Sequence, residues 1–317
     1  MDIKMTTMSQ VHQLEGRKVK FDFNQIPKHW IENDPVSTHM LNTAHMILPA
    51  GEFWFCRVFN KALPYVTDDQ LRADVKGFIQ QEAIHGRTHQ HAQVYFDQHG
   101  LEVKPFIQRM HYLFEILLGE NPLGVQMFKK IVGEKRWLMF RLGVIAAIEH
   151  YTGVAGQWSL DNTSLDSADP VMADLFKWHL AEEVEHRSVA FDLFAHMYES
   201  EFNFQISKNA LMAFIFPIMA TVWIEGGKTI LKQDQDAGKF RRMGTLRLIM
   251  QMEKISRKTD HLPTFSYLIL ATFRWFNPKF HPVQEGDTQQ ALDYLARSPS
   301  AVQAEKEAAL LKSTKMS

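Results

Sequence analysis

The stretch WHLAEEVEHRSVAFD, residues 178–192, has a helical pattern but carries acids and histidines among apolar residues. At about 100° per helical residue, His179, Glu183 and His186 fall on one narrow face, with apolar residues before and after them. Charged or polar groups in such a stripe are costly unless they are paired or bind a metal ion. The spacing therefore indicates metal chemistry, provided that other segments supply partners.

Three other segments show the same combination. In VKGFIQQEAIHGRTH, Glu82 and His85 form Glu-x-x-His on an apolar helix face. Glu52 lies on the apolar stripe of MILPAGEFWFCRVF, and Glu149 continues the stripe of RLGVIAAIEHYTGVAG. The order along the chain is thus Glu, Glu-x-x-His, Glu and Glu-x-x-His on four long predicted helices. Carboxylate-bridged dinuclear iron or manganese sites draw this ligand set from a four-helix bundle.

Neighbouring polar residues leave alternatives open. We expect His179 to be a third imidazole ligand. The alternative is that it is a buried histidine that only supports another ligand. His89 is a further candidate ligand, although orienting another ligand is the role that we expect for it. Glu182 could replace Glu183 as the ligand, but the apolar stripe favours Glu183. His150 points away from the stripe of the preceding glutamate and is not expected to bind metal.

An all-α fold is expected to position these groups, as a ferritin-like four-helix bundle with additional C-terminal helices. We expect an N-terminal arm over residues 1–37, with a strand-like piece at KVKFDF, then a single helical metal-binding domain over 38–277. Residues 278–317 are expected to form a partly flexible C-terminal segment. Gly153 and Gly156 are expected to leave space beside the nearby acid. The predicted helices lie near residues 38–63, 68–99, 105–119, 134–160, 169–200, 204–232, 236–257 and 262–276.

Composition excludes several classes of function. The chain of 317 residues has 35 basic and 36 acidic residues, so its net charge of −1 gives no electrostatic case for nucleic-acid binding. Its single cysteine, Cys56, excludes an intrachain disulfide and a cysteine-rich metal site, and it fits a reducing cytosol. The N-terminus lacks the apolar segment of a secretory signal. The predicted location is therefore cytoplasmic.

The most apolar run is ALMAFIFPIMATVWI, residues 210–224, which contains Pro217. It is shorter than the ~20 residues that span a bilayer, so we expect a buried or interfacial helix. A membrane surface is a compatible partner but is not favoured, because the run lacks the basic face that is usual for interfacial helices. A homodimer is also compatible with the sequence.

The motifs LPAGE, FIQQEAIHGRTH, AAIEH and WHLAEEVEHRSVAFD resemble the ferritin-like di-iron carboxylate superfamily, over roughly residues 20–235. More narrowly, they look like a bacterial family labelled predicted metal-dependent hydrolase. The ligand pattern is also similar to that of p-aminobenzoate N-oxygenase, in which a three-His, four-Glu di-iron site activates O₂ to oxidise an arylamine. The resemblance implies two Fe ions, or Mn or a mixed Fe/Mn pair, and O₂ as co-substrate. The implied metal ligands are Glu52, Glu82, His85, Glu149, His179, Glu183 and His186.

Our leading hypothesis is an O₂-activating dinuclear iron oxidase or monooxygenase that acts on a small, apolar or aromatic organic substrate. The 23 phenylalanines and 7 tryptophans favour an apolar substrate pocket, with an ordinary core as the alternative. No GxGxxG follows a predicted strand, and one cysteine cannot hold an iron–sulfur cluster. An external electron donor or reductase is therefore the expected partner.

Two other functions remain open. A dinuclear metal-dependent hydrolase would use paired cations to generate hydroxide and hold a phosphoryl or acyl group. Such sites tend to include Asp ligands, and the four stripes contain none, which counts mildly against this alternative. The second alternative is a metal-binding protein without catalysis.

Overall fold

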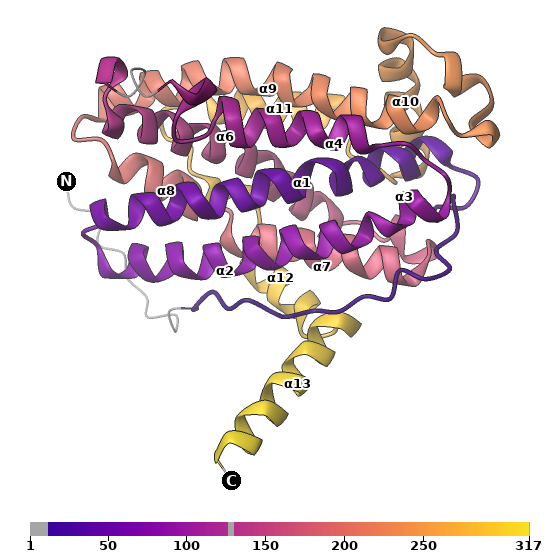
Figure 1. The fold of residues 1–317 in the computed structure, drawn as a ribbon, viewed down its shortest axis with the longest axis horizontal. Helices are drawn as coiled ribbons and strands as arrows, with labels where there is room; N and C mark the ends of the chain where they lie inside the picture. Colours follow the sequence, from indigo (N-terminus) through magenta and orange to yellow (C-terminus); the bar gives the residue numbers. More distant parts are fainter. Residues whose placement is uncertain (1–11, 126–129, 317) are drawn as a thin grey trace.

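The computed structural model describes residues 12–125 and 130–316, which are mostly helical and contain no strand. The all-α prediction is confirmed, and long helices run side by side along the molecule (Figure 1). Residues 1–11 of the predicted arm lie outside the described residues. The α-helices are α1 (Pro35–Ala62), α2 (Asp69–Ala92), α3 (Val94–Gln98), α4 (Lys104–His111), α6 (Glu134–Leu160), α7 (Pro170–His186), α8 (Val189–His196), α9 (Glu201–Leu231), α10 (Thr245–Thr259), α11 (Phe265–Trp275), α12 (Thr288–Leu295) and α13 (Pro299–Met316). The shorter helical turns are η1 (Leu63–Tyr65), η2 (Tyr112–Leu117), η3 (Pro122–Gly124), η4 (Ser164–Ser167), η5 (Gln235–Arg242) and η6 (Pro282–Glu285).

Four helices, α1, α2, α6 and α7, form the centre of the bundle. α1 packs against α2, and α6 packs against α7. Aspartates cap three of these helices, because Asp34, Asp68 and Asp169 each accept a hydrogen bond from a backbone N–H in the first turn. Pro49 lies inside α1 and leaves a carbonyl one turn earlier without its helical partner. This is the carbonyl of His45, and the Gln93 side chain donates a hydrogen bond to its oxygen across 2.8 Å.

Two glycines let α6 and α7 approach closely. A Cβ atom at Gly156 would lie 2.4 Å from the carbonyl oxygen of Leu180, and one at Gly153 would lie 3.0 Å from the Cβ of Arg187. The expectation that these glycines leave space beside the acid is therefore wrong. The backbone and side chains of α7 fill that space instead.

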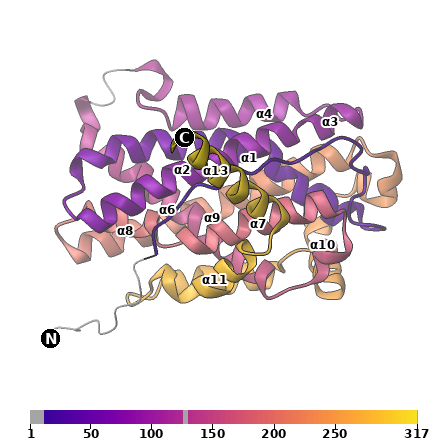
Figure 2. The ribbon, with the colours of Figure 1, turned by 90° about the horizontal axis from the view of Figure 1, so that it is seen from below.

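An outer layer covers this centre. α9 packs on α1 and α6, and α11 packs on α6 and α9. α4 and α11 lie on opposite sides of the molecule when it is seen from below (Figure 2). The region expected as a loosely held C-terminal segment contains α12, which packs on α7, and α13, which projects from the bundle (Figure 1).

Three local expectations differ from the structure. The KVKFDF stretch forms no strand. It belongs instead to an extended N-terminal segment, residues 12–34, that runs across α2 and α7 (Figures 1 and 2). The helix predicted over 169–200 is interrupted between α7 and α8, although no glycine or proline marks the break. The helix predicted over 236–257 is split into η5 and α10, because Met243 and Gly244 between them adopt extended backbone conformations. Gly238, with a φ of +54°, adds a kink inside η5.

Candidate metal centre

The predicted ligands lie together at the centre of the bundle. Glu52 comes from α1, Glu149 from α6, and the two Glu-x-x-His pairs come from α2 and α7. All seven side chains are buried, with at most 3% of any residue exposed. Four elements therefore direct carboxylates and imidazoles into the interior of the bundle.

These residues form two groups of donor atoms. Within each group, the ligand atoms that the residues offer all lie within 4.8 Å of one another. The first group consists of Glu52, His85, His179 and Glu183. The second group consists of Glu82, Glu149, Glu183 and His186. Glu183 belongs to both groups, which is the arrangement of a carboxylate that bridges two cations.

The two oxygens of Glu183 face different groups. Its Oε1 lies 2.8 Å from His179 Nε2 and 3.4 Å from His85 Nδ1. Its Oε2 lies 3.3 Å from His186 Nε2. One carboxylate can therefore bind a different ion through each oxygen.

The remaining acids complete the two groups. His186 Nε2 lies 3.3 Å from a carboxylate oxygen of Glu82 and 3.3 Å from one of Glu149. On the other side, His179 Nε2 lies 3.7 Å from Glu52 Oε1. Each group thus combines imidazole nitrogen with carboxylate oxygen, a donor set that suits iron, manganese or zinc.

Several of these donor atoms have no hydrogen-bond partner. Both oxygens of Glu82, one oxygen each of Glu52 and Glu149, and Nδ1 of His85 are buried and unpartnered. A buried polar atom without a partner costs free energy, and a buried carboxylate costs more. Bound cations would satisfy these atoms, so the residues present fit a pair of metal ions.

The pKa values show how strongly the site depends on compensating charge. Burial, reinforced by neighbouring carboxylates, raises the pKa of Glu52 and of Glu149 well above the usual range. Burial also opposes the charged form of Glu183, but the nearby imidazoles, His186 foremost, hold its pKa well below the usual range. Burial lowers the pKa of His179 to about 4, so this imidazole is neutral at pH 7, as a ligand must be.

Behind the first group, Glu182 and His89 contact ligands without being among the donors. Glu182 Oε2 lies 2.8 Å from His85 Nε2, the nitrogen that points away from the donor group. His89 Nε2 lies 2.6 Å from His179 Nδ1. Both residues therefore occupy positions from which they orient an imidazole.

Behind the second group, a hydrogen-bonded branch supports His186. Its Nδ1 lies 2.9 Å from Gln81 Oε1, and Gln81 Nε2 donates to Glu185 across 2.8 Å. Arg17 joins the two branches, because its Nη1 donates to Glu182 at 2.9 Å and to Glu185 at 2.8 Å. The N-terminal segment thus fixes the residues that hold two of the ligands.

Sequence reasoning missed four of these supporting residues. Arg17, Gln81 and Glu185 have no metal-ligand spacing, and the helical angle of Glu185 places it away from the apolar stripe. His45, whose Nδ1 lies 2.8 Å from His89 Nδ1, is not singled out by any motif. The available signal, an excess of polar residues on α7 beyond the metal stripe, applies to Glu185.

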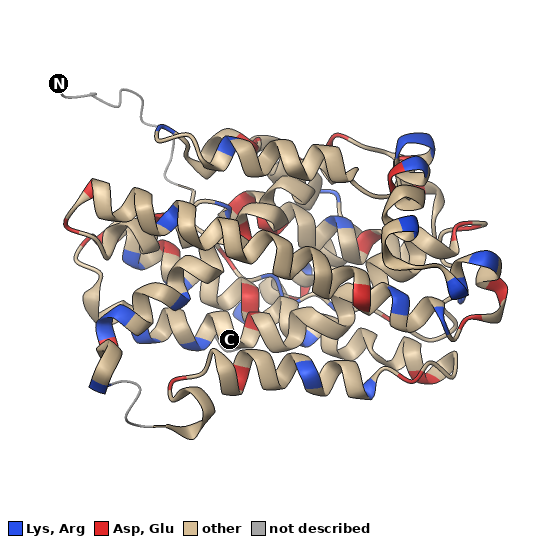
Figure 3. Cartoon of the chain, turned by 90° about the horizontal axis from the view of Figure 1, so that it is seen from above, with Lys and Arg blue, Asp and Glu red and all other residues tan. Residues whose placement is uncertain are grey.

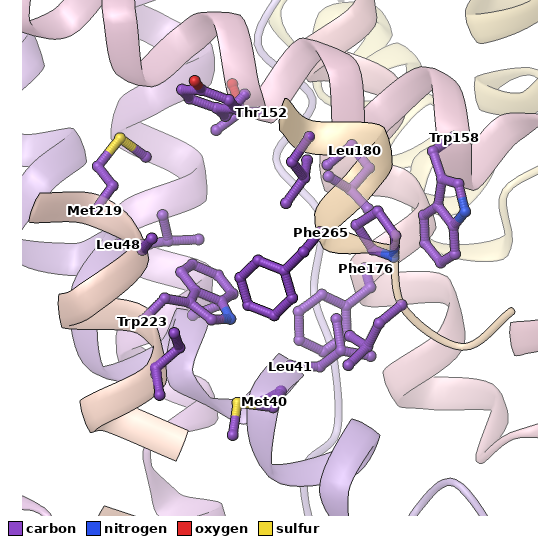
Figure 4. A pocket seen from close by; sticks show the side chains of 18 of the residues that line it. Met40, Leu41, Leu48, Thr152, Trp158, Phe176, Leu180, Met219, Trp223 and Phe265 are labelled. Atoms are coloured by element: carbon purple, nitrogen blue, oxygen red, sulfur yellow. The ribbon is translucent and has the colours of Figure 1, made fainter. Parts of the chain in front are cut away.

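A cavity of about 210 Å³ is lined in part by His179 of the first group, and Figure 4 shows many of its other lining side chains. His179 and His89 contribute to one end, and the rest of the lining is almost entirely apolar. α1, α6 and α7 form the inner wall, and α9 and α11 form the outer wall, from which Trp223 and Phe265 extend into the pocket. A substrate in this cavity would reach the first donor group rather than the second.

A third cluster of histidine and acid lies elsewhere and already contains its own positive charge. His29 Nε2 and His39 Nε2 lie 2.6 and 2.9 Å from the same oxygen of Asp234. Lys28 Nζ lies 3.3 Å from the other oxygen, so an ammonium group neutralises this acid. The cluster ties the N-terminal segment and α1 to the end of α9.

His150, which was not expected to bind metal, also lies outside both donor groups. Its Nε2 lies 3.1 Å from the carbonyl oxygen of Ala271 on α11, so this nitrogen donates to the outer layer. Three aromatic rings surround the imidazole.

The described residues form an all-α bundle that contains two adjacent, buried donor groups, each able to hold a metal ion. The chain belongs to the family described as predicted metal-dependent hydrolase, whose model matches residues 15–286. No curated protein matches the chain, and no solved structure does. Membership of this family therefore rests on a match to most of the chain, including all seven candidate ligands.

Proposed function

We propose that this chain is a dinuclear metal-dependent enzyme with a ferritin-like di-iron carboxylate centre. The observation that carries the proposal is the shared Glu183, whose two oxygens face two separate donor groups. The unpartnered, buried carboxylate oxygens support it, because two cations would neutralise them. The proposed ligands are the seven residues of the two groups.

The proposed substrate is a small, largely apolar organic molecule. The cavity beside His179 has an apolar lining and no Lys or Arg, so nothing in it would recognise a phosphate or a free carboxylate. Phe176, Trp223 and Phe265 would hold an aromatic or aliphatic group and exclude water from the adjoining donor group. Thr152 and the indole N–H groups of Trp158 and Trp223 could contact a heteroatom of the substrate, whereas the Tyr151 hydroxyl is already paired with Thr272.

The proposed reaction is oxidation of this substrate by O₂, with iron as the proposed metal. A bound iron pair would supply the redox chemistry that side chains lack. The chain's own contribution is to hold the ligands: His89 orients His179, and Glu182 orients His85. An external electron donor is the proposed partner, and the cytoplasm is the proposed location.

Hydrolysis is the second candidate, and the family description favours it. Paired cations can also generate hydroxide, and the same seven ligands could hold zinc or manganese for that purpose. The apolar cavity would then accept an ester or amide with an apolar acyl group. Family membership gives oxidation no support, so the choice between the two reactions rests on the site.

Metal analysis and two activity screens test the proposal. Purified protein should contain two metal ions per chain, with iron predominating. After anaerobic reduction it should consume O₂ faster when an accepted amine, aromatic compound or fatty acid is present. Two zinc ions, no O₂ consumption and cleavage of apolar esters would establish the hydrolase instead. Protein that binds no metal under any loading condition would overturn both.

A further inference from the structure

The exposed side of α9 is apolar, which is the reverse of what a surface helix normally shows. Phe202, Ile206, Phe214 and Ile218 follow at intervals of four or eight residues, and each is between 50% and 72% exposed. The other exposed positions on this side up to residue 221 are small or uncharged. Solvent therefore meets a helix face without a charged side chain over about five turns.

α11 extends this apolar surface. It packs beside α9, and its Ile269, Leu270 and Phe273 are 41%, 58% and 67% exposed. Viewed from above, the side of the molecule that holds α9 and α11 carries few charged residues (Figure 3). We call the exposed side chains of these two helices the α9–α11 face. A continuous apolar surface on two adjacent helices marks an interaction site rather than scattered exposed residues.

Basic residues border one end of the α9–α11 face. Along one side of α10, Leu246 and Met250 are exposed and are followed by exposed Lys254. Arg242 and Arg247 are exposed close by, and no ion pair between described residues involves any of these three cations. Figure 3 shows several Lys and Arg residues at the end of the molecule that holds α10, alongside Asp and Glu residues. The basic residues that the apolar run itself lacks are therefore supplied by the elements that follow it.

The same two helices form the outer wall of the apolar cavity. Phe216 and Trp223 of α9 and Phe265 of α11 line the cavity with their inner sides. The α9–α11 face is the outer side of that wall. An apolar environment against this face would therefore adjoin the cavity rather than a remote part of the surface.

We propose that the α9–α11 face docks on the surface of a lipid membrane that contains anionic lipids. Apolar side chains enter the interfacial region, and the cations of η5 and α10 contact anionic headgroups. By length and composition α9 could also cross a membrane, with a mean hydropathy of 1.6 in its most apolar window, of which 22% is buried. However, α9 packs along α1 and α6, so it lies on the membrane as part of the bundle.

Vesicle co-flotation of the metal-loaded, full-length protein tests this proposal. Wild-type protein should float with phosphatidylcholine vesicles that contain phosphatidylglycerol, and high salt should weaken the binding. The double variant F214E/F273E should lose at least about tenfold of the vesicle binding, because two exposed apolar anchors become charged. Phe214→Leu with Phe273→Leu should keep the binding, since it preserves apolar anchors at both positions.

Matched controls separate the parts of the surface. L310E changes a residue of α13 that is 67% exposed, like Phe273, but lies outside the α9–α11 face, so it should bind like wild type. The triple variant R242Q/R247Q/K254Q should lose about tenfold of its binding to anionic vesicles and most of its salt dependence. Equal losses in L310E and F214E/F273E would overturn the proposal.

Two further results would count against a membrane as the occupant of this face. Wild-type protein that floats with neither type of vesicle would overturn the proposal. A wild-type dimer that F214E/F273E converts to a monomer in light scattering, without vesicle binding, would assign the face to a second copy of the chain and overturn it as well. The docking proposal does not depend on the proposed enzymatic function. Flotation of protein that contains no metal would support docking while the dinuclear centre failed.

Discussion

The centre of the bundle and its outer layer invert the usual distribution of side chains in opposite ways. Around Glu183 the interior is polar, with acids and imidazoles that are almost fully buried. On α9 the surface is apolar, with Phe202 72% and Phe214 69% exposed. Buried polar groups and large exposed apolar patches are the informative departures from ordinary burial.

Each of these two regions needs something that the chain alone does not provide. Cations would neutralise the acids at the centre, and an apolar environment would cover the α9–α11 face. Between them lies the cavity, which touches His179 at one side and is closed by α9 and α11 at the other. The buried polar centre and the exposed apolar face therefore both adjoin this cavity.

The largest expected effect is at the shared carboxylate. Glu183→Ala should reduce the metal content from two ions per chain to none, because each donor group loses a ligand. Glu52→Ala should remove one ion only, since Glu52 belongs to one group. Elemental analysis of the purified variants measures this, with exposed Glu134→Ala as the control. Two retained ions in Glu183→Ala would contradict the bridging assignment.

A smaller effect is expected at His150, which follows Glu149 on α6 and contacts Ala271 of α11. Burial lowers its pKa to about 4, while the unfolded chain takes up a proton near pH 6.5. The resulting contribution to the free energy of unfolding is fully present above pH 6.5 and is lost as pH falls toward 4. The loss should be about 2 kcal/mol between pH 6.5 and 5.

Urea unfolding of wild-type protein and His150→Gln at pH 7.5 and pH 5 tests this pH dependence. The glutamine amide can still donate to the Ala271 carbonyl but does not titrate. The stability difference between the two proteins should therefore shrink or reverse at the lower pH, while shared titrating groups cancel. A difference that does not change with pH would show that His150 is not the group responsible.

The smallest expected effect is on the outer surface. Phe214→Ser should change the free energy of unfolding by about 0.5 kcal/mol or less, because the side chain is mostly exposed in the free protein. Phe59→Ala, in the core and fully buried, should cost about 3–5 kcal/mol. Denaturant unfolding without lipid measures both. A large loss at Phe214 would mean that another copy of the chain covers this position in solution.

Much of the central bundle could be predicted from the sequence. Apolar periodicity places helices close to α1, α2, α6 and α7, and the predicted range 134–160 coincides with α6. The same periodicity predicts that the seven candidate ligands face the core, because they lie on the apolar faces of their helices. The division into two groups that share Glu183 could be seen only in the three-dimensional structure. Spacing along one helix does not show which donor atom faces which neighbouring helix.

Tertiary contacts account for what could not be predicted. Arg17 lies in a segment without helical periodicity, and it reaches Glu182 and Glu185 only because residues 12–34 cross α2 and α7. The apolar run on α9 is expected to be buried or interfacial, and sequence alone does not show which side of a helix its neighbours leave open. The break after His186 carries no glycine or proline signal at all.

Gly156 has a consequence for the chemistry although it contributes no donor atom. A Cβ atom at Gly156 would collide with the backbone carbonyl of Leu180, and a backbone group cannot rotate away as a side chain can. A single methyl group at position 156 would force α7 outward. It would thereby draw Glu183 of α7 away from Glu149, which lies two turns before Gly156 on α6. The distance between the ligands on α6 and those on α7 therefore depends on the absence of a side chain at Gly156.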